Sequence, residues 1–263
     1  MSGDAGSPRT ALTYVGHATV LIDIDGVRML TDPILRRRVA HLRRHGAVNP
    51  HVLRGVDAVL ISHAHMDHLD FPSLERLGRD MPVVVPKGAG PMLRRHRFTH
   101  VTEVVVGERF AIGGLEVEAT YADHERKRLP FGREVEPVGY LVSGSRRVYF
   151  AGDTDLFDEM AAIGKDGLDA ALLPVWGWGP NLGPGHLDPE QAAQAAALLQ
   201  PVSAVPIHWG TLSPLRPGGA TVPSAEPPQR FLDALADAAP RVRGVLLAPG
   251  ETLTLEPAAP SAR

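Results

Sequence analysis

The sequence contains no cysteine, which excludes disulfides and metal sites built on thiolates. No stretch approaches the roughly 18–20 consecutive apolar residues that a membrane-spanning helix needs, and the first ten residues contain no apolar core of a signal peptide. The net charge is only −3, so the chain lacks the basic excess of nucleic-acid-binding domains. These absences predict a cytoplasmic protein with no transmembrane segment and no nucleic-acid partner.

The chain is long enough, at 263 residues, to bury a core of its own without further covalent links. Its composition does not shift enough to divide it, and it has no short-period repeat or low-complexity segment. We therefore predict a single domain over residues 11–256, between a disordered N-terminal tail at 1–10 and a disordered tail at 257–263.

Short apolar, β-branched runs recur along the chain and predict many strands. Three longer segments predict helices, at 71–79, 188–201 and 227–239. Strands outnumber helices, and the helices follow strands, which favours an α/β or α+β domain with packed sheets and outer helices.

Three segments give more local predictions. Residues 12–31 alternate apolar and polar side chains and predict a hairpin with its turn at Asp25–Gly26. The arginine-rich residues 32–50 that follow predict an irregular surface loop. Residues 242–256 predict a second hairpin at the C-terminal end.

The stretch ISHAHMDHLD, at residues 61–70, gathers three of the chain's 12 histidines directly after an apolar run. His63 and His65 are two apart at the end of a predicted strand, so both imidazoles can point toward one ion. Asp67 and His68 follow where the chain turns toward a helix, and they can face a second point nearby. Imidazole and carboxylate suit Zn²⁺, and also Mn²⁺ or Fe²⁺.

A local run cannot close a metal site alone, so other ligands must come from distant segments. His124, Asp153 and His208 each follow a predicted strand, where a loop can reach a shared edge. The seven residues suffice for two ions about 3.5–4 Å apart. The alternative is a set of scattered core or surface residues, which their order and their placement at strand ends disfavour.

The succession HxHxDH, DH, GDTD and PIHWGT resembles the metallo-β-lactamase superfamily over residues 12 to about 250. The opening YVGHATVLIDIDGVRMLTDPIL and the later GHLDPEQA are similar to one branch. That branch contains N-acylphosphatidylethanolamine-hydrolysing phospholipase D and L-ascorbate-6-phosphate lactonase. The resemblance implies a four-layer αβ/βα sandwich, with two mixed β-sheets between outer helices and the metals at one edge of the sheets.

The resemblance also implies a ligand assignment and a reaction. One metal would take His63, His65 and His124, the second would take Asp67, His68 and His208, and Asp153 would bridge the two. A hydroxide that bridges two divalent ions can attack an ester, lactone, amide or phosphodiester. Relatives that reduce oxygen carry a glutamate where His65 stands, so the imidazole argues for a hydrolase. Asp67 and Asp153 thus count as catalytic candidates.

Several residues are candidates for substrate contact. His186 matches a histidine that the phospholipase and lactonase relatives have near their metals, and it can donate a proton to the substrate or leaving group; it can equally belong to the turn before the helix. Trp176 and Trp178 lie in a Gly/Pro-rich loop and offer an apolar platform, although packing against the fold accounts for them as well. Arg126, close after His124, is the candidate for an anionic group.

Other polar residues have two open interpretations. His17, Asp32 and Asp70 can orient the metal-binding side chains, or they can make local turn and capping bonds. The arginine runs at 36–44 and 94–97 can recognise a phosphorylated or anionic small molecule, or they can form solvated faces.

The sequence thus predicts a dinuclear metal-dependent hydrolase of lactonase or phosphodiesterase type, with Zn²⁺ as the first choice of metal. Two alternatives remain open: a phospholipase D-like phosphodiesterase, and a non-catalytic metal-containing binding or sensor protein.

Overall fold

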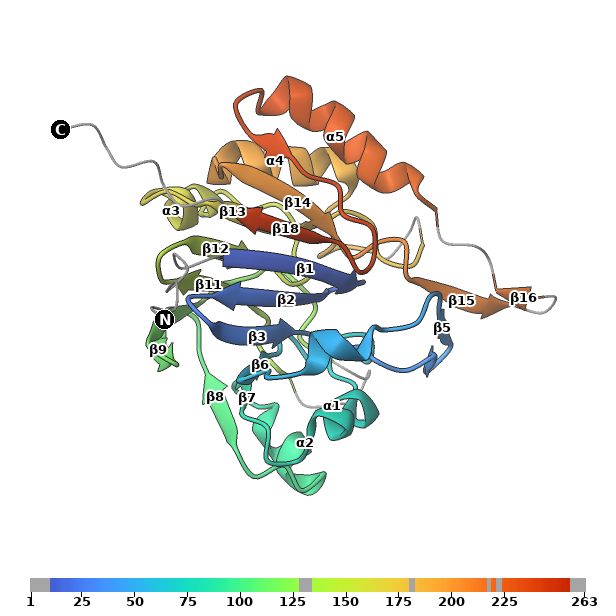
Figure 1. Cartoon of the computed structure of the whole chain (residues 1–263). Helices are drawn as coiled ribbons and strands as arrows, with labels where there is room; N and C mark the ends of the chain where they lie inside the picture. Colours follow the sequence, from blue (N-terminus) through green and yellow to red (C-terminus); the bar gives the residue numbers. More distant parts are fainter. Residues whose placement is uncertain (1–9, 128–133, 180–182, 217–218, 221–223, 256–263) are drawn as a thin grey trace, which may run out of the picture.

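The computed structural model describes residues 10–127, 134–179, 183–216, 219–220 and 224–255. Most of both predicted tails lies outside these residues, and Thr10, placed by prediction in the first tail, is the first residue of a strand. Figure 1 shows two large sheets stacked in the middle of the molecule, with helices above and below them.

The first sheet has seven strands. Their spatial order is β18 (Thr252–Leu255), β1 (Thr10–Gly16), β2 (Thr19–Ile24), β3 (Val27–Thr31), β6 (Ala58–Leu60), β7 (Val83–Pro86) and β8 (Val101–Val104). The pairs from β3 through β8 are parallel, and the others are antiparallel.

The second sheet also has seven strands. Their order is β17 (Arg243–Gly244), β14 (Ser203–Ile207), β13 (Ala170–Pro174), β12 (Arg147–Phe150), β11 (Val138–Ser143), β10 (Leu115–Tyr121) and β9 (Arg109–Ile112). The pairs from β12 through β17 are parallel and the rest are antiparallel, so this sheet is mixed as well.

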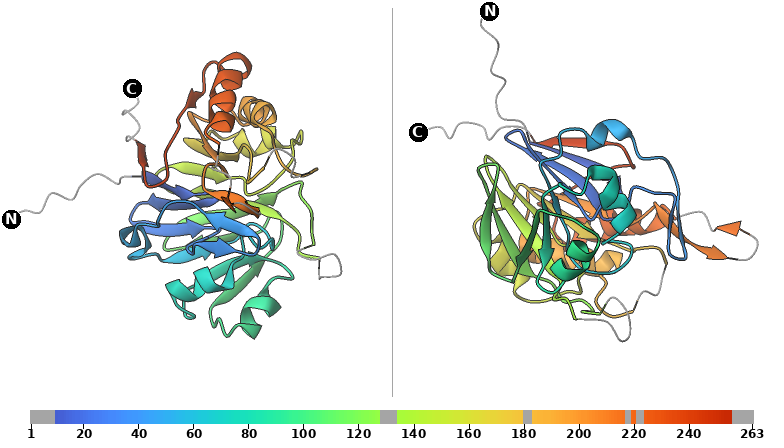
Figure 2. Two further views of the ribbon diagram at one scale, coloured as in Figure 1. Left: turned by 90° about the vertical axis from the view of Figure 1, so that its right-hand side faces the viewer. Right: turned by 90° about the horizontal axis from the view of Figure 1, so that it is seen from below.

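The helices lie on the outer faces of the two sheets. They are α1 (Phe71–Leu77), α2 (Gly90–Arg95), α3 (Met160–Gly164), α4 (Pro189–Leu199) and α5 (Glu226–Ala238), with a 3₁₀ turn at Pro50–Leu53. α1 and α2 lie on one side of the sheets, and α4 and α5 lie on the other (Figures 1 and 2). The predicted α/β fold with two mixed sheets is confirmed.

Apolar packing explains the layers. Tyr14 and Ile22 of the first sheet share one buried cluster with Tyr140 and Phe150 of the second, so the two sheets pack face to face. The opposite face of the first sheet contributes to a separate cluster with α1 and α2, in which Val85 is fully buried. A sheet that buries both faces must be apolar on both, which explains the continuous apolar runs at 58–60 and 83–86.

A third, smaller sheet lies at one end of the molecule, at the right of Figure 1. Its strands are β16 (Gly219–Ala220), β15 (Leu212–Arg216), β5 (Leu42–Arg44) and β4 (Arg38–Val39). The prediction of an irregular loop over 32–50 was therefore wrong for part of that segment. Val39 and Leu42 are buried against Ile34 and Leu212, and this apolar packing stabilises the β4–β5 hairpin. The surrounding arginines made these strands hard to predict from the sequence.

Two other local predictions need correction. Residues 12–31 form three strands rather than one hairpin: the Asp25–Gly26 turn joins β2 and β3 as predicted, but the chain also reverses after Gly16. The predicted hairpin at 242–256 was wrong, because β17 pairs with β14 in the second sheet whereas β18 pairs with β1 in the first. This last segment crosses between the sheets.

Among the residues that the structure describes, no helix is long and apolar enough to cross a membrane.

Candidate metal centre

The predicted ligands come from the carboxyl ends of strands in both large sheets. Ser62 to His68 follow β6, His124 follows β10, Asp153 follows β12, and His208 follows β14 directly. Ligands bind at this end of strands in many sheets, because loops from several strands meet there. After His65 the chain turns, and the N–H groups of His68 and Leu69 both donate to the His65 carbonyl. This turn separates the motif into two halves that face different points.

The first group consists of His63, His65 and His124. His63 Nε2 lies 3.1 Å from His65 Nδ1, and His124 Nε2 lies 2.9 Å from the same atom. The other ring nitrogens face outward: His65 Nε2–H donates to the Lys127 carbonyl at 3.1 Å, and His124 Nδ1–H donates to the Gly185 carbonyl at 2.6 Å. Since carbonyl oxygens only accept, the inward nitrogens of these two rings carry lone pairs.

The second group consists of Asp67, His68 and His208. His68 Nε2 and His208 Nε2 are 3.1 Å apart, and Asp67 Oδ2 lies 3.8 Å and 4.0 Å from them. His68 Nδ1–H donates to Asp32 Oδ2 at 2.7 Å, which points Nε2 inward. Asp32 also accepts hydrogen bonds from the backbone and hydroxyl of Ser62, at 2.7 and 2.5 Å, so it is fixed on three sides.

Asp153 lies between the two groups. Its Oδ2 is 3.0 Å from His68 Nε2 and 4.0 Å from His63 Nε2, and its Oδ1 is 3.3 Å from His208 Nε2. The carboxylate is buried, and Oδ1 has no hydrogen-bond partner among the described residues. A buried charged oxygen without a donor is costly unless a cation approaches it.

These contacts test whether divalent cations fit the site. The inward lone pairs of His65 and His124, on nitrogens 2.9 Å apart, repel one another unless a cation lies between them. The donors are imidazoles and carboxylates, the ligands that Zn²⁺ and similar ions take in proteins without cysteine. Each group brings its donor atoms within 4.8 Å of one another. The residues fit metal ions.

The protonation states agree with this conclusion. Burial lowers the pKa of His63 well below its usual range and lowers the pKa of His124 to about 4. Burial alone would also lower the pKa of His68, but the charges of Asp153 and Asp67 raise it well above its usual range. Burial opposes ionisation of Asp153, yet His208 and His68 hold the pKa of its carboxyl well below its usual range. The neutral imidazoles of His63 and His124 and the ionised carboxylate of Asp153 are already in the forms that coordinate cations, whereas His68, whose pKa is raised, must lose a proton when an ion binds.

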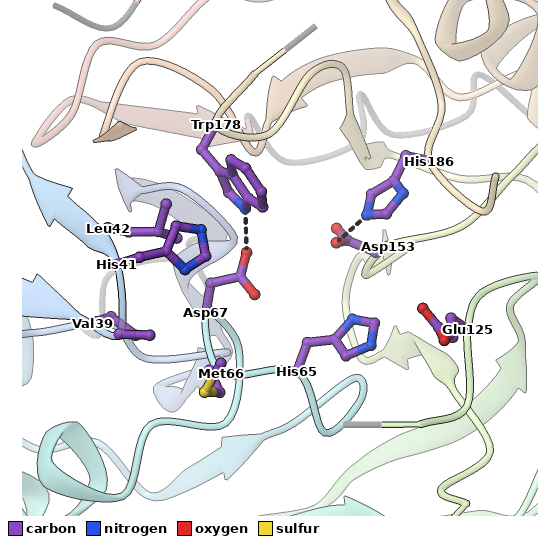
Figure 3. Close-up of a pocket in the computed structure, with 11 residues that line it drawn as sticks. Val39, His41, Leu42, His65, Met66, Asp67, Glu125, Asp153, Trp178 and His186 are labelled. Carbon is purple, nitrogen blue, oxygen red and sulfur yellow. Dashed lines mark hydrogen bonds and ion pairs between the residues drawn. The ribbon is translucent and has the colours of Figure 1, made fainter. Parts of the chain in front are cut away.

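A cavity of about 200 Å³ opens onto the two groups (Figure 3). Its lining includes His65, Asp67 and Asp153 together with the predicted substrate residues Trp178 and His186. The remaining lining residues come from the β4–β5 hairpin and from two neighbours of the ligands: Val39, Ala40, His41, Leu42, Met66 and Glu125. A cavity wall at this hairpin was not predicted from the sequence, although the apolar Val39 and Leu42 stand out within the basic run.

The other predicted substrate residues lie elsewhere. Trp176 packs against the main core, and Arg126 is exposed and pairs with Glu136 at 3.4 Å; neither lines the cavity. His186 Nε2 lies 3.6 Å from Asp153 Oδ2 and lines the cavity, to the right of Trp178 in Figure 3. We therefore retain His186 and Trp178 as candidates.

Two of the arginines and Asp70 have structural partners. Arg36 makes a two-nitrogen contact with Asp70, and Asp70 also caps α1 by accepting from Ser73. Arg44 is buried and donates to the carbonyls of Val15 and Ile34. Asp70 thus follows the capping interpretation, whereas Asp32 follows the orienting one.

Asp70→Ala is therefore expected to lower the free energy of unfolding by about 2 kcal/mol, since it removes a helix cap and a charge-assisted hydrogen bond. Zinc affinity should stay within about twofold of wild type, because Asp70 touches no predicted ligand. Urea unfolding and chelator competition measure the two quantities. Asp80→Ala, at an exposed position beyond the same helix, is the control and should change stability by less than about 0.5 kcal/mol. A large loss of zinc affinity in the Asp70 variant would contradict the assignment.

Comparisons with known proteins agree with this geometry. A family model described as a β-lactamase superfamily domain matches residues 27–209. A UPF0173 metal-dependent hydrolase from Methanopyrus kandleri is 32% identical over 253 residues, covering 92% of this chain and 98% of that protein. The solved structure of Igni18, a metallo hydrolase from Ignicoccus hospitalis, has a TM-score of 0.70 at 27% identity and covers 94% of this chain and 99% of its own.

A further structure shares the fold alone. CmlA, a diiron β-hydroxylase from Streptomyces venezuelae, has a TM-score of 0.71 at 23% identity, covering 96% of this chain and 55% of that chain. The same architecture therefore supports more than one chemistry, and side chains in the site must decide between them. The narrower resemblance to the phospholipase and lactonase branch stays a prediction.

Proposed function

This chain belongs to the β-lactamase superfamily of metal-dependent hydrolases, and from that premise we propose that it is a dinuclear enzyme that cleaves a small ester or lactone. His63, His65 and His124 would hold one ion, Asp67, His68 and His208 the other, and Asp153 would contact both. Zn²⁺ is the metal that we propose, because the set is rich in imidazole. The observation that carries the proposal is the convergence of these side chains, of which His65, Asp67 and Asp153 line one cavity.

Divalent ions held there supply Lewis acidity, which lowers the pKa of water and stabilises negative charge that develops on the substrate. The chain's own residues supply position and protons. Asp32 fixes the His68 ring through its 2.7 Å hydrogen bond, and the Gly185 carbonyl fixes the His124 ring. His186 lines the cavity, 20% exposed, where its imidazole can donate a proton to a leaving group.

The walls of the cavity favour a carbonyl substrate over a phosphodiester. Phosphate sites commonly use arginine or lysine, and none of the described residues that line this cavity is an arginine or a lysine. Val39, Leu42, Met66 and Trp178 instead form an apolar side, suited to a short acyl group. The volume of about 200 Å³ lies below the usual range for ligand pockets, roughly 300–1,000 Å³, which supports a small substrate.

The test combines metal analysis with a substrate panel. We expect two equivalents of zinc per chain and turnover of short-chain esters or lactones, with activity on a matched phosphodiester at least about tenfold lower. Acyl chains of increasing length measure the size limit. Phosphodiester turnover that exceeds ester turnover would favour the phosphodiesterase alternative. Full zinc occupancy without turnover of any ester, lactone or phosphodiester would favour a binding or sensor protein.

A further inference from the structure

His17 is a fully buried histidine beside the second group, outside the predicted ligand set. It stands where the chain reverses between β1 and β2, with a φ of 58°, a conformation that non-glycine residues seldom adopt. Its N–H donates to Thr211 Oγ1 at 3.0 Å, and its carbonyl accepts from the His208 N–H at 2.7 Å. The backbone is thus held on both sides, which fixes the direction in which the side chain leaves it.

The ring points at a predicted metal ligand. His17 Nε2 lies 3.1 Å from Asp67 Oδ2, and the ring centroid lies 4.0 Å from that of His208. Two roles are compatible with these distances: Nε2 either coordinates a cation together with Asp67, or carries a hydrogen and donates it to the carboxylate.

The second ring nitrogen separates the two roles. A histidine that binds a metal nearly always donates its other N–H to an oxygen, as His65, His68 and His124 do here. His17 Nδ1 is buried and has no partner among the described residues. Coordination through Nε2 would place a hydrogen on Nδ1 and leave a buried donor unsatisfied. Donation from Nε2 leaves only an unpaired acceptor on Nδ1.

A second donor reaches the same oxygen. Trp178 Nε1–H donates to Asp67 Oδ2 at 3.2 Å, from the loop that walls the cavity (Figure 3). Oδ2 is also the Asp67 oxygen that faces His68 and His208. Two N–H groups from segments far apart in the chain therefore converge on one oxygen of this carboxylate.

We propose that His17 is a positioning residue, which together with Trp178 holds the Asp67 carboxylate in the orientation that receives the second metal ion. The inference rests on the proposed role of Asp67 as a ligand. Its consequence is specific: loss of the His17 donor weakens one metal site, and a side chain that restores the donor restores that site.

The experiment compares His17→Phe, which removes the donor, with His17→Gln, whose amide can reach the same oxygen. Zinc affinity at each site is measured by chelator competition on the full chain, and the Co²⁺-substituted protein gives an absorption spectrum for each site. We expect His17→Phe to weaken one of the two sites by about 10- to 100-fold, the usual effect of losing such a partner. His17→Gln should stay within about threefold, with an unchanged Co²⁺ spectrum.

Two further variants complete the design. Trp178→Phe keeps an aromatic ring but removes the second donor, and should weaken the same site by about tenfold; it carries the test if His17→Phe does not fold. His45→Phe is the matched control, because His45 is a histidine just after β5 that hydrogen-bonds to Ser213 rather than to the metal groups. It should leave both affinities unchanged.

Wild-type affinity at both sites in His17→Phe and Trp178→Phe would overturn the inference while leaving the proposed function intact. An equal loss in His17→Gln and His17→Phe, with a changed Co²⁺ spectrum, would also overturn it, because it would identify His17 as a ligand. A wild-type chain that binds no divalent ion would overturn the inference and the proposed function together.

Discussion

Asp153→Asn is expected to lower kcat/KM for the best ester substrate by more than about 100-fold while leaving the fold intact. The amide has the shape of the carboxylate, so packing is preserved, but the negative charge shared by the two groups is lost. Removing the outer partner of a ligand costs about 10- to 100-fold, and removal of the shared ligand itself should exceed that range. Zinc content should fall below two per chain.

The measurements are steady-state kinetics, zinc content and circular dichroism on the same preparation. Asp158→Asn is the control: it makes the same change at an exposed residue in the same loop, and it should match wild type in all three. His65→Ala should lose turnover in the same way through the first group. Near-wild-type turnover in both Asp153→Asn and His65→Ala would exclude the dinuclear mechanism.

Strand positions were readable from the sequence because burial on both faces leaves apolar runs. The runs before His63 and before His208 both proved to be central strands, and the residues that follow them meet at one edge. Residues that follow buried strands can gather at one edge of packed sheets, so their position after apolar runs predicted that these distant histidines would lie together. The assignment of individual residues as ligands stays a prediction, since geometry alone shows proximity.

The errors came from features that depend on distant partners. The β4–β5 segment has the sequence of a basic loop, and its strand β5 is stabilised by pairing with the distant β15. β17 and β18 have the sequence pattern of a hairpin, but they pair with strands of different sheets. The reversal at His17 was not predicted: Gly16 is its only local signal, and the hydrogen bonds that hold it come from Thr211 and His208, far along the chain. Such tertiary bonds override local propensity.

The second large expected effect is the loss of turnover and of thermal stability when divalent ions are removed from the charged site. Removal of divalent ions should abolish turnover and lower the melting temperature by at least about 10 °C relative to the protein with zinc at 100 times its dissociation constant. Binding at that excess stabilises the folded chain by about 2.7 kcal/mol per ion, hence about 5 kcal/mol for two. For a domain near this size, each kcal/mol shifts the melting temperature by about 2–4 °C. Differential scanning calorimetry, before and after dialysis against a chelator, measures the shift.

The identity of the added ion provides the control for that shift. Zn²⁺ should restore both the melting temperature and turnover, whereas Mg²⁺ should restore little of either, because it prefers an all-oxygen shell and this site offers mainly imidazole. Asp153→Asn should show a much smaller zinc-dependent shift than Asp158→Asn, since the shared carboxylate is the charge that both ions need. An equal rise with Mg²⁺, or a full zinc-dependent shift in Asp153→Asn, would mean that the stabilising ion binds outside the seven residues. Without an ion at these residues, His68 would stay protonated between Asp153 and Asp67, whose charges raise its pKa well above its usual range although burial lowers it.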